Sequence, residues 1–266
     1  MKLLLAVDIG NSETKLGLFR GNRLLARTSS RAPEPRQQFR ELGPLPRSAP
    51  KALVSGAALA AVALASVVGH KQKLWENYSR AVLALDPFVI SGASPTPLLV
   101  RYRPRRSLGP DRLAAAVAAA EIVGAPVIVA HLGTATVVDA VSAKKEFLGG
   151  AIAPGVGLSA QFLAEETDRL PRVRVKPAGR KASPLGTNTA DCIRAGALYG
   201  AAGQVELLTS KMRDLVGRKA RLVLTGGWAA PISRLLETKH VLRPALTLEG
   251  IQLIWQFNEE PRARRR

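Results

Sequence analysis

One strand–turn–strand pattern occurs twice in this chain, and the repetition constrains the fold more than any other feature. The segment AVDIGNSETKLGL at residues 6–18 aligns with AHLGTATVVDAV at residues 130–141, and in both a glycine followed by a small hydroxyl or amide residue falls at the turn. Self-similarity of this kind indicates one structural unit used twice. We therefore expect two related domains.

The apolar pattern around each copy predicts a mixed sheet that starts with a three-strand meander and is flanked by helices. Strands are expected at 2–8, 14–20, 23–28, 62–68, 87–91, 126–131, 136–142, 146–152 and 221–225. Helices are expected at 71–84, 110–123, 157–168, 189–213, 228–236 and 248–258. Residues 31–50 hold five prolines and should form a loop or a broken helix. The chain is predicted to be an α/β protein with domains at 1–106 and 107–266.

The composition indicates the class of protein and its cellular compartment. The chain has 266 residues of which 47% are hydrophobic, enough for two cores. A single cysteine, Cys192, excludes an intramolecular disulfide and a cysteine-based zinc cluster, which fits a reducing compartment. The apolar start MKLLLAV is too short for a secretory signal, and the stretch at 52–69 is mostly Ala, Gly and Ser, unlike a membrane span. We expect a cytoplasmic protein without a membrane partner.

The chain is strongly basic. Lys and Arg number 39 against 20 Asp and Glu, a formal net charge of +19 that concentrates anions near the surface. Nucleic acid, ATP and carboxylate metabolites are all candidate partners. In the basic segments, at 101–106, 169–181 and 261–266, no aromatic interleaving suggests base stacking, so a solvated basic surface is the simpler interpretation.

The first copy of the pattern has the features of a phosphate-binding hairpin. Asp8 ends an apolar strand, Gly10 opens the turn, and Lys15 lies on the next strand. A turn without a bulky Cβ lets backbone N–H groups approach phosphate, and the lysine adds a point charge. The spacing is not GxxxxGK[ST], so this is not a P-loop. Taken alone, the pattern also fits an ordinary β-turn.

Two further glycine elements follow. Gly133, Thr134 and Thr136 mark the second hairpin, and TGGWAAP at 225–231 lies at a strand-to-helix junction where small residues leave room for a flat base. Two facing hairpins can hold a triphosphate between two domains. The three elements in this order resemble the superfamily of acetate and sugar kinases, Hsp70 and actin, which implies two actin-like (ribonuclease H-like) domains.

The segment LGPDR at 108–112 offers groups for an acceptor hydroxyl. Asp111 is ionised at neutral pH by its ordinary pKa and is the candidate general base. Arg112 can clamp a carboxylate with two parallel hydrogen bonds, and Tyr102 can cover the pocket with its ring. The alternative is that Asp111 only caps the helix that follows.

A more specific resemblance covers almost the whole chain except about 30–60. The order of DIGNSETK, YRPRRSLGPDR, GTATVVDAVS, FLGGAIAPGVGLSAQFL, GTNTADCIRAGALYG, TGGWAAPI and LTLEGIQLIWQFN resembles type III pantothenate kinase, the Bvg accessory factor family. The resemblance implies ATP-dependent phosphorylation of pantothenate to 4'-phosphopantothenate, the first step of coenzyme A biosynthesis. It also implies Mg²⁺ with ATP, a monovalent cation (K⁺ or NH₄⁺) and a homodimer.

The same resemblance assigns roles to individual positions. It makes Asp111 the proton acceptor. The ATP phosphates would be bound by Asp8, Ile9, Gly10, Asn11, Ser12, Glu13, Thr14 and Lys15, and on the second hairpin by Gly133 and Thr134. The pantothenate site would comprise Tyr102, Gly109, Pro110, Asp111, Arg112 and Thr189.

The chain departs from the family pattern at His131. The family has an aspartate there and assigns it to the monovalent cation, and the internal repeat independently aligns His131 with Asp8. An imidazole is a poor potassium ligand because hard cations prefer oxygen. Either the potassium dependence is lost or the enzyme is impaired. Together with the net charge of +19, this leaves an alternative: a catalytically impaired paralogue that acts as a nucleic-acid-binding or regulatory protein. The sequence contains no helix-turn-helix pattern or stacking motif that would support this alternative.

Overall fold

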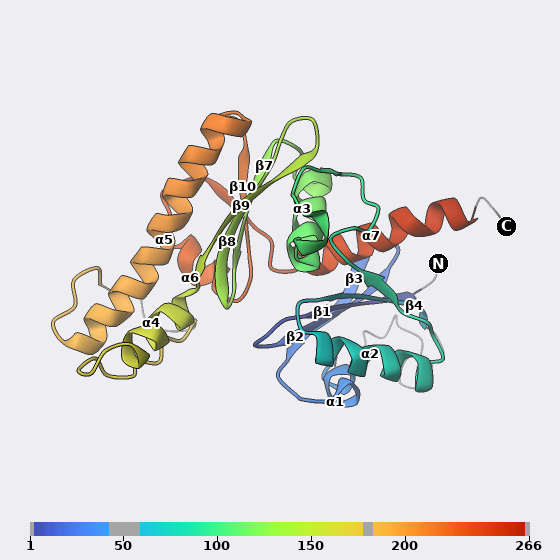
Figure 1. Ribbon diagram of the computed structural model, residues 1–266, viewed down its shortest axis with the longest axis horizontal. Coiled ribbons are helices and arrows are strands. Elements are labelled where there is room, and N and C mark those ends of the chain that lie inside the picture. The colour runs from blue at the N-terminus through green and yellow to red at the C-terminus, as the bar shows by residue number, and fades with distance from the viewer. Residues whose placement is uncertain (1–2, 43–58, 178–182, 264–266) are drawn as a thin grey trace. The chain divides into compact units, whose positions relative to one another are not determined.

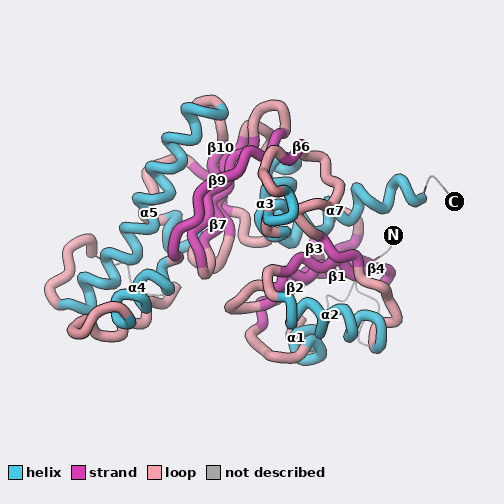
Figure 2. The backbone as a smooth tube through the Cα atoms, viewed as in Figure 1, coloured by secondary structure: helices cyan, strands magenta, loops and turns pink. Residues whose placement is uncertain are grey.

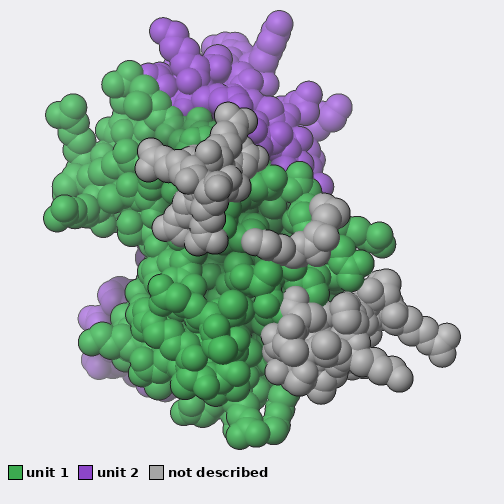
Figure 3. Space-filling model, turned by 90° about the vertical axis from the view of Figure 1, so that its right-hand side faces the viewer, with its two compact units in different colours: residues 1–118, 246–266 green, residues 119–245 purple. Residues whose placement is uncertain are grey.

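The structure is a computed structural model that describes residues 3–42, 59–177 and 183–263, with the side chains described through residue 259. The parts of the predicted broken helix and of the Ala-rich stretch at 43–58 lie outside these residues, as does the basic end at 264–266. The chain forms two compact units, residues 1–118 with 246–266 (unit 1) and residues 119–245 (unit 2), which Figure 3 colours separately.

Unit 1 is built on a five-stranded sheet in the order β3-β2-β1-β4-β5 (Figure 1). The first three strands form the predicted antiparallel meander, and β4 and β5 extend it in parallel. The strands of this sheet are β1 (Leu3–Ile9), β2 (Thr14–Arg20), β3 (Arg23–Ser30), β4 (Leu59–Ser66) and β5 (Phe88–Ile90). Unit 1 also contains the short strand β6 (Leu99–Val100), which is not part of this sheet. Its helices are α1 (Pro35–Arg40), α2 (Gly69–Ala81), α7 (Leu246–Ala263), a 3₁₀ turn at Arg105–Ser107 and the start of α3 (Pro110–Ile122).

Unit 2 repeats this plan, with its strands in the order β11-β10-β7-β8-β9. The meander β7-β8-β9 is again antiparallel, and β10 and β11 again extend it in parallel. The strands are β7 (Val127–Leu132), β8 (Ala135–Val141), β9 (Glu146–Pro154), β10 (Arg221–Thr225) and β11 (His240–Leu242). The helices are α4 (Val156–Glu165), α5 (Thr189–Val216) and α6 (Ala229–Ser233).

Matching hydrogen bonds confirm the internal repeat. The Ile9 carbonyl at the end of β1 accepts from Val67 N at 3.1 Å, and the Leu132 carbonyl at the end of β7 accepts from Trp228 N at 3.0 Å. Both bonds join a central strand to the segment that leads into a helix. The predicted α/β fold, with two mixed sheets that each begin with a meander, is therefore confirmed.

Burial explains why β1 is the central strand of unit 1. All seven of its residues are buried, as in a strand with both faces covered. Leu3, Leu5 and Val7 share a core with Trp75 of α2. The alternate residues point to the opposite face, where α7 packs on β1 (Figures 1 and 2). In unit 2 the corresponding core joins β7, β8 and β10 to α5.

The last helix belongs to unit 1 although it is last in the sequence. A Cβ built on Gly250 of α7 would lie 1.8 Å from the Ala114 carbonyl oxygen of α3, so the two helices approach as closely as only glycine allows. Gln252 donates a hydrogen bond to Asn22 Oδ1 at 3.1 Å. The compact units thus differ from the predicted domains at 1–106 and 107–266, which stay a prediction, in taking α7 and the start of α3 into unit 1.

Most predicted elements lie within a few residues of the observed ones. The Ala-rich segment is a strand, β4, as predicted, because it is buried between β1 and β5. β6 and β11 were not predicted. Among the described residues, no helix is both long and apolar enough to cross a membrane.

Candidate functional site

The first hairpin is closed by a backbone hydrogen bond across its turn, and the turn leaves little room for a side chain at Gly10. Gly10 N donates to the Glu13 carbonyl oxygen at 3.0 Å. A Cβ on Gly10 would lie 3.1 Å from the same oxygen, so a larger residue would crowd the turn. Asn11 and Ser12 at its tip are exposed, and Ile9 and Thr14 on either side of it are buried. A tight turn with an accessible tip is thereby fixed at the end of β1.

A small group of charges surrounds this turn. The strand register places Asp8 directly across from Lys15. The Lys15 ammonium lies 3.8 Å from Asp8 Oδ2 and 3.8 Å from Glu13 Oε1. Burial raises the pKa of Asp8 from 3.8 to about 6, Lys15 opposes the shift, and the carboxylates of Asp111 and Glu13 add to it. Asp8, Glu13, Lys15 and Asp111 therefore form one electrostatic cluster within unit 1.

Asp111 lies in the first turn of α3 but not at its cap. The first helical bond runs from Leu113 N to the Gly109 carbonyl at 3.1 Å, so Gly109 occupies the position before the helix and Pro110 begins it. A Cβ on Gly109 would stand 2.6 Å from Asp111 Oδ1, so the carboxylate folds back over this glycine. The half-buried Asp111 carboxylate is directed to the start of the helix, so a role in stabilising the helix start stays the alternative to its proposed role as a base.

Tyr102 and Arg112 lie together, as their predicted joint role requires. The Arg112 guanidinium carbon is 5.2 Å from the centroid of the Tyr102 ring, within the range of a cation–π contact. Arg112 is only 7% exposed, whereas Tyr102 is partly exposed. The ring therefore contacts a buried guanidinium that belongs to the residue next to Asp111 in the sequence.

In unit 2, three glycine-bearing segments meet at the end of β7. Gly133 N donates to the Ala135 carbonyl at 2.9 Å, which closes the second hairpin. Gly155 N donates to the Thr134 carbonyl at 3.0 Å, and a Cβ on Gly155 would lie 2.4 Å from the Gly133 carbonyl oxygen. Gly226 has φ +98°, and its Cβ would lie 2.3 Å from the Leu132 carbonyl oxygen. The 225–231 element lies at a junction between β10 and α6, as predicted, and its approach to the end of β7 and that of Gly155 to the second hairpin are additions.

His131 takes the place that Asp8 has in unit 1. Asp8 pairs with Lys15 on the antiparallel side and Ala65 on the parallel side, whereas His131 pairs with Val137 and Thr225. Its Nε2 atom lies 3.7 Å from the position of a Cβ on Gly133, so the imidazole runs along the hairpin toward the turn. Among the described residues no group of three or more His, Cys, Asp or Glu side chains could hold a metal ion.

Thr189 begins α5 and borders a cavity of about 690 Å³ between α4 and α5. Asn188 before it accepts a hydrogen bond from Asp191 N at 3.0 Å and caps the helix. The cavity walls are mostly apolar, and include Leu158, Phe162, Leu163, Leu170 and Ile193. Thr189 thus supplies a hydroxyl at the edge of an apolar hollow in unit 2.

Sequence reasoning missed one charged neighbour of the first hairpin. Lys71, in the first turn of α2, donates to the Asn11 carbonyl oxygen at 3.1 Å. It lies 60 residues along the chain from that residue, outside every motif. The only signal available was that the repeat places the start of a helix beside the end of β1.

Solved structures with this arrangement of repeated sheets define the class of fold. A conserved Baf family protein of Campylobacter jejuni has a TM-score of 0.59 at 18% identity, covering 96% of this chain and 99% of that one. The activator of the 2-hydroxyisocaproyl-CoA dehydratase of Clostridium difficile, solved with bound ADPNP, has a TM-score of 0.56 at 15% identity, covering 99% of this chain and 97% of that one. The fold is that of the actin-like α/β proteins.

Sequence comparison identifies the family within this class. The family model described as type III pantothenate kinase matches residues 4–211. A type III pantothenate kinase of Moorella thermoacetica is 37% identical over 260 residues, covering 96% of this chain and 100% of that protein. The chain belongs to the type III pantothenate kinase family.

The buried carboxyl of Asp8 predicts a pH dependence of stability. Because its folded pKa is raised from 3.8 to about 6, the folded protein keeps a proton that the unfolded chain releases, so stability falls as pH rises through this interval. A shift of about two pKa units corresponds to roughly 3 kcal/mol. In Asp8→Asn the side chain stays neutral. The difference in free energy of urea unfolding, wild type minus variant, should fall by about this amount between pH 4 and 7, and a difference independent of pH would contradict it.

Proposed function

We propose that the cluster at the first hairpin and the start of α3 transfers the γ-phosphoryl group of ATP to the primary hydroxyl of pantothenate. Type III pantothenate kinase activity, which opens coenzyme A biosynthesis, follows from the family and from the full-length relative at 37% identity. The observation that carries the assignment to this site is the proximity of Asp111 to the hairpin, where its charge acts on Asp8. Support for the alternative, a nucleic-acid-binding or regulatory paralogue, remains the net charge of +19 and the residue at position 131.

The hairpin is suited to the nucleotide phosphates. Its tip offers backbone N–H groups, and Lys15 supplies an ammonium within 3.8 Å of two carboxylates that phosphate oxygens can replace as partners. In this proposal Asp8, Ile9, Gly10, Asn11, Ser12, Glu13, Thr14 and Lys15 form the first phosphate-binding segment. Gly133 and Thr134 of the second hairpin supply further nucleotide contacts.

The Mg²⁺ that accompanies ATP needs only one or two protein carboxylates beside the phosphates, and Asp8 offers one at the hairpin. The negative charges of Asp111 and Glu13 act on Asp8, and oxygen is the ligand that Mg²⁺ prefers. Asp8 is the residue that would hold the hydrated ion, which when bound neutralises phosphate charge. A nearby cation would favour the ionised form of the Asp8 carboxyl, whose burial otherwise favours the neutral form.

The acceptor side is arranged around the start of α3. Asp111 orients the pantothenate hydroxyl and takes its proton, while catalysis otherwise consists of positioning and charge stabilisation. Arg112, held by the Tyr102 ring, is the proposed partner of the pantothenate carboxylate. Gly109 and Pro110 line the same site, and Thr189 adds a hydroxyl from the start of α5.

Replacing Asp111 tests the assignment. Asp111→Asn keeps the size of the side chain but cannot accept the proton, so kcat should fall on the order of 10²- to 10⁴-fold, as is typical when a general base is lost. The affinity for ATP should change little. Asp86→Asn is the matched control, because Asp86 is an exposed carboxylate paired with Arg80 at 2.8 Å. Near-normal turnover in Asp111→Asn, measured by ATP-dependent formation of phosphopantothenate, would remove Asp111 from the mechanism.

His131 is the proposed substitute for the monovalent cation of the family. An imidazolium beside the second hairpin supplies positive charge without a bound ion. One unit charge at about 4 Å and an effective dielectric of about 20 contributes roughly 4 kcal/mol, comparable to what an ion at that place would provide. The ring already points along the hairpin toward Gly133.

This proposal predicts the response to potassium. Wild-type activity should be unchanged by added K⁺ or NH₄⁺ at constant ionic strength. His131→Asp restores a carboxylate, so this variant should become dependent on either cation, with His240→Asp in the same unit as the control. Severalfold activation of the wild type by potassium would mean that other oxygen atoms hold the ion, and the substitution argument would fail.

A homodimer is the proposed assembly, with the apolar cavity of unit 2 at the contact between copies. Leu158, Phe162 and Leu163 of α4 are exposed, Phe162 by 55%, and they border the cavity that Thr189 also reaches. Apolar side chains gathered at this density are typical of an interaction surface. A second copy would cover them and bring Thr189 close to the boundary between subunits.

Sedimentation of the purified protein tests the assembly. The wild type should sediment as a dimer, and Phe162→Asp should dissociate it, because a charge would be buried without a partner. Leu215→Asp is the control, since Leu215 is 82% exposed on α5 and does not border the cavity. A monomeric wild type, or equal dissociation by both variants, would exclude this face as the interface.

A further inference from the structure

Lys71 makes a contact with the first hairpin that the proposed mechanism has not used. From the first turn of α2, its ammonium donates to the carbonyl oxygens of Asn11 at 3.1 Å and Gly10 at 3.4 Å. These two carbonyls belong to the turn that carries the proposed phosphate-binding N–H groups. The side chain therefore acts on the backbone of the turn and not on another side chain.

The geometry of the peptide bond connects this contact to the opposite side of the turn. In a trans peptide the C=O and the next N–H point in opposite directions. The Gly10 carbonyl shares its peptide plane with the N–H of Asn11, and the Asn11 carbonyl shares one with the N–H of Ser12. Holding both carbonyls at Lys71 directs both N–H groups away from it. Successive N–H groups directed to one side form an anion-binding concavity.

The two lysines at the hairpin have different surroundings. Lys15 faces two carboxylates, Asp8 and Glu13, each at 3.8 Å. Among the described residues, Lys71 forms no ion pair and donates only to the two backbone carbonyls. Its charge is thus not offset by a carboxylate in contact with it, and it polarises the two peptide groups in the sense that strengthens their N–H groups as donors.

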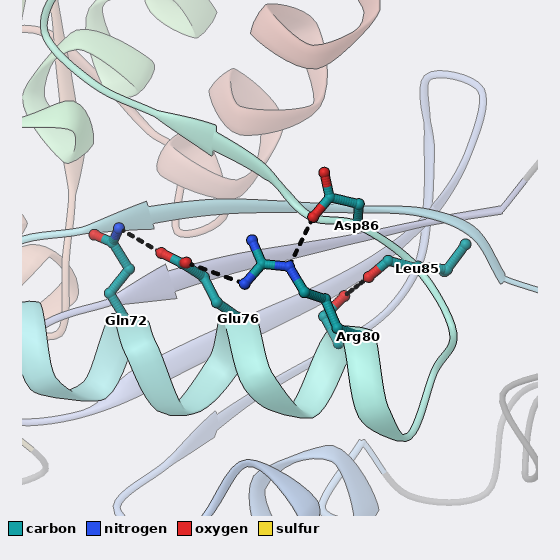
Figure 4. Close-up of polar contacts among 6 residues, drawn as sticks. Gln72, Glu76, Arg80, Leu85 and Asp86 are labelled. Atoms are coloured by element: carbon teal, nitrogen blue, oxygen red, sulfur yellow. Dashed lines mark hydrogen bonds and ion pairs between the residues drawn. The ribbon is translucent and has the colours of Figure 1, made fainter.

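Helix α2 holds Lys71 in place at both of its ends. At the start, the bond from Val67 N to the Ile9 carbonyl ties the segment before the helix to the end of β1. At the end, Figure 4 shows Arg80 joined to Asp86, with Nε to Oδ1 at 2.8 Å, and to Glu76. Trp75 in the middle is buried. A lysine on a helix anchored in this way is suited to fix a turn.

We propose that Lys71 is a positioning residue for nucleotide binding, which holds the Gly10 and Asn11 carbonyls so that the N–H groups of Asn11 and Ser12 face a nucleotide phosphate. The inference rests on the proposed function of the hairpin. It assigns to Lys71 a role in binding the nucleotide and none in binding pantothenate.

The test compares Lys71→Met, Lys71→Arg and the control Lys73→Met, since Lys73 is an exposed lysine on the same helix. Binding of ADP is measured calorimetrically without pantothenate, and KM is measured for each substrate. Lys71→Met should weaken ADP binding and raise the KM for ATP about tenfold or more, as expected for loss of a charge-assisted hydrogen bond. The KM for pantothenate and the melting temperature should stay unchanged. Lys71→Arg should recover most of the affinity, and Lys73→Met should resemble the wild type.

Three outcomes would overturn the proposal. Equal loss in Lys71→Met and Lys73→Met would show a general effect of net charge. Unchanged ADP binding in Lys71→Met would show that the turn keeps its conformation without the lysine. A wild type that does not bind ADP would remove the role altogether. A wild type that binds ADP but does not phosphorylate pantothenate would refute the proposed reaction, and the comparison of ADP affinities would still decide the role of Lys71.

Discussion

A nearly buried carboxyl group, Asp8, faces the ammonium of Lys15 at the end of a strand that has no exposed residue, and much of unit 1 is arranged around that pair. Removing the carboxylate from water favours its neutral form, and the lysine across the strand offsets only part of this effect. Asp8 lies opposite Lys15 only in the observed register of β1 and β2, and the glycine turn between the two strands maintains this register. Asp111 adds a further negative charge from the start of α3, so the binding of a cation or of a phosphate would alter the same electrostatic balance.

The two hairpins share one backbone geometry but are stabilised by different interactions. In unit 1 the position before the turn is a carboxylate paired with a lysine, whereas in unit 2 it is a histidine whose neighbours across the strands are Val137 and Thr225. The second turn is instead enclosed by backbone, since Gly155 and Gly226 both lie where a Cβ would strike it. The first hairpin thus depends on charge and the second on close packing.

The sequence predicted features that local pattern controls. Alternating apolar residues indicated the meanders, and the turn glycines marked both hairpins. Tyr102 and Arg112, ten positions apart, were assigned to one pocket, and the structure places them in contact. Features that depend on tertiary proximity were not predictable. Lys71 reaches the hairpin from 60 residues away, and Gly155 matters only because its backbone meets the Thr134 carbonyl. The strand β11 has three residues, of which Val241 and Leu242 are exposed. It is too short, and too little of it is buried, for its sequence to show the apolar alternation of a strand. Nor could a linear pattern show that α7 returns to unit 1.

That return has a consequence for how the protein is made. Unit 2 is one continuous stretch, residues 119–245, so all of it has been synthesised before α7 appears. The face of β1 that α7 covers has by then been outside the ribosome since the first part of translation, without the apolar side chains of Leu248, Ile251 and Ile254. Contacts between segments that are far apart in the sequence form slowly. The nascent chain therefore carries the whole of unit 2 while unit 1 still lacks one of its layers, and residues 246–266 decide when the first hairpin acquires its full support.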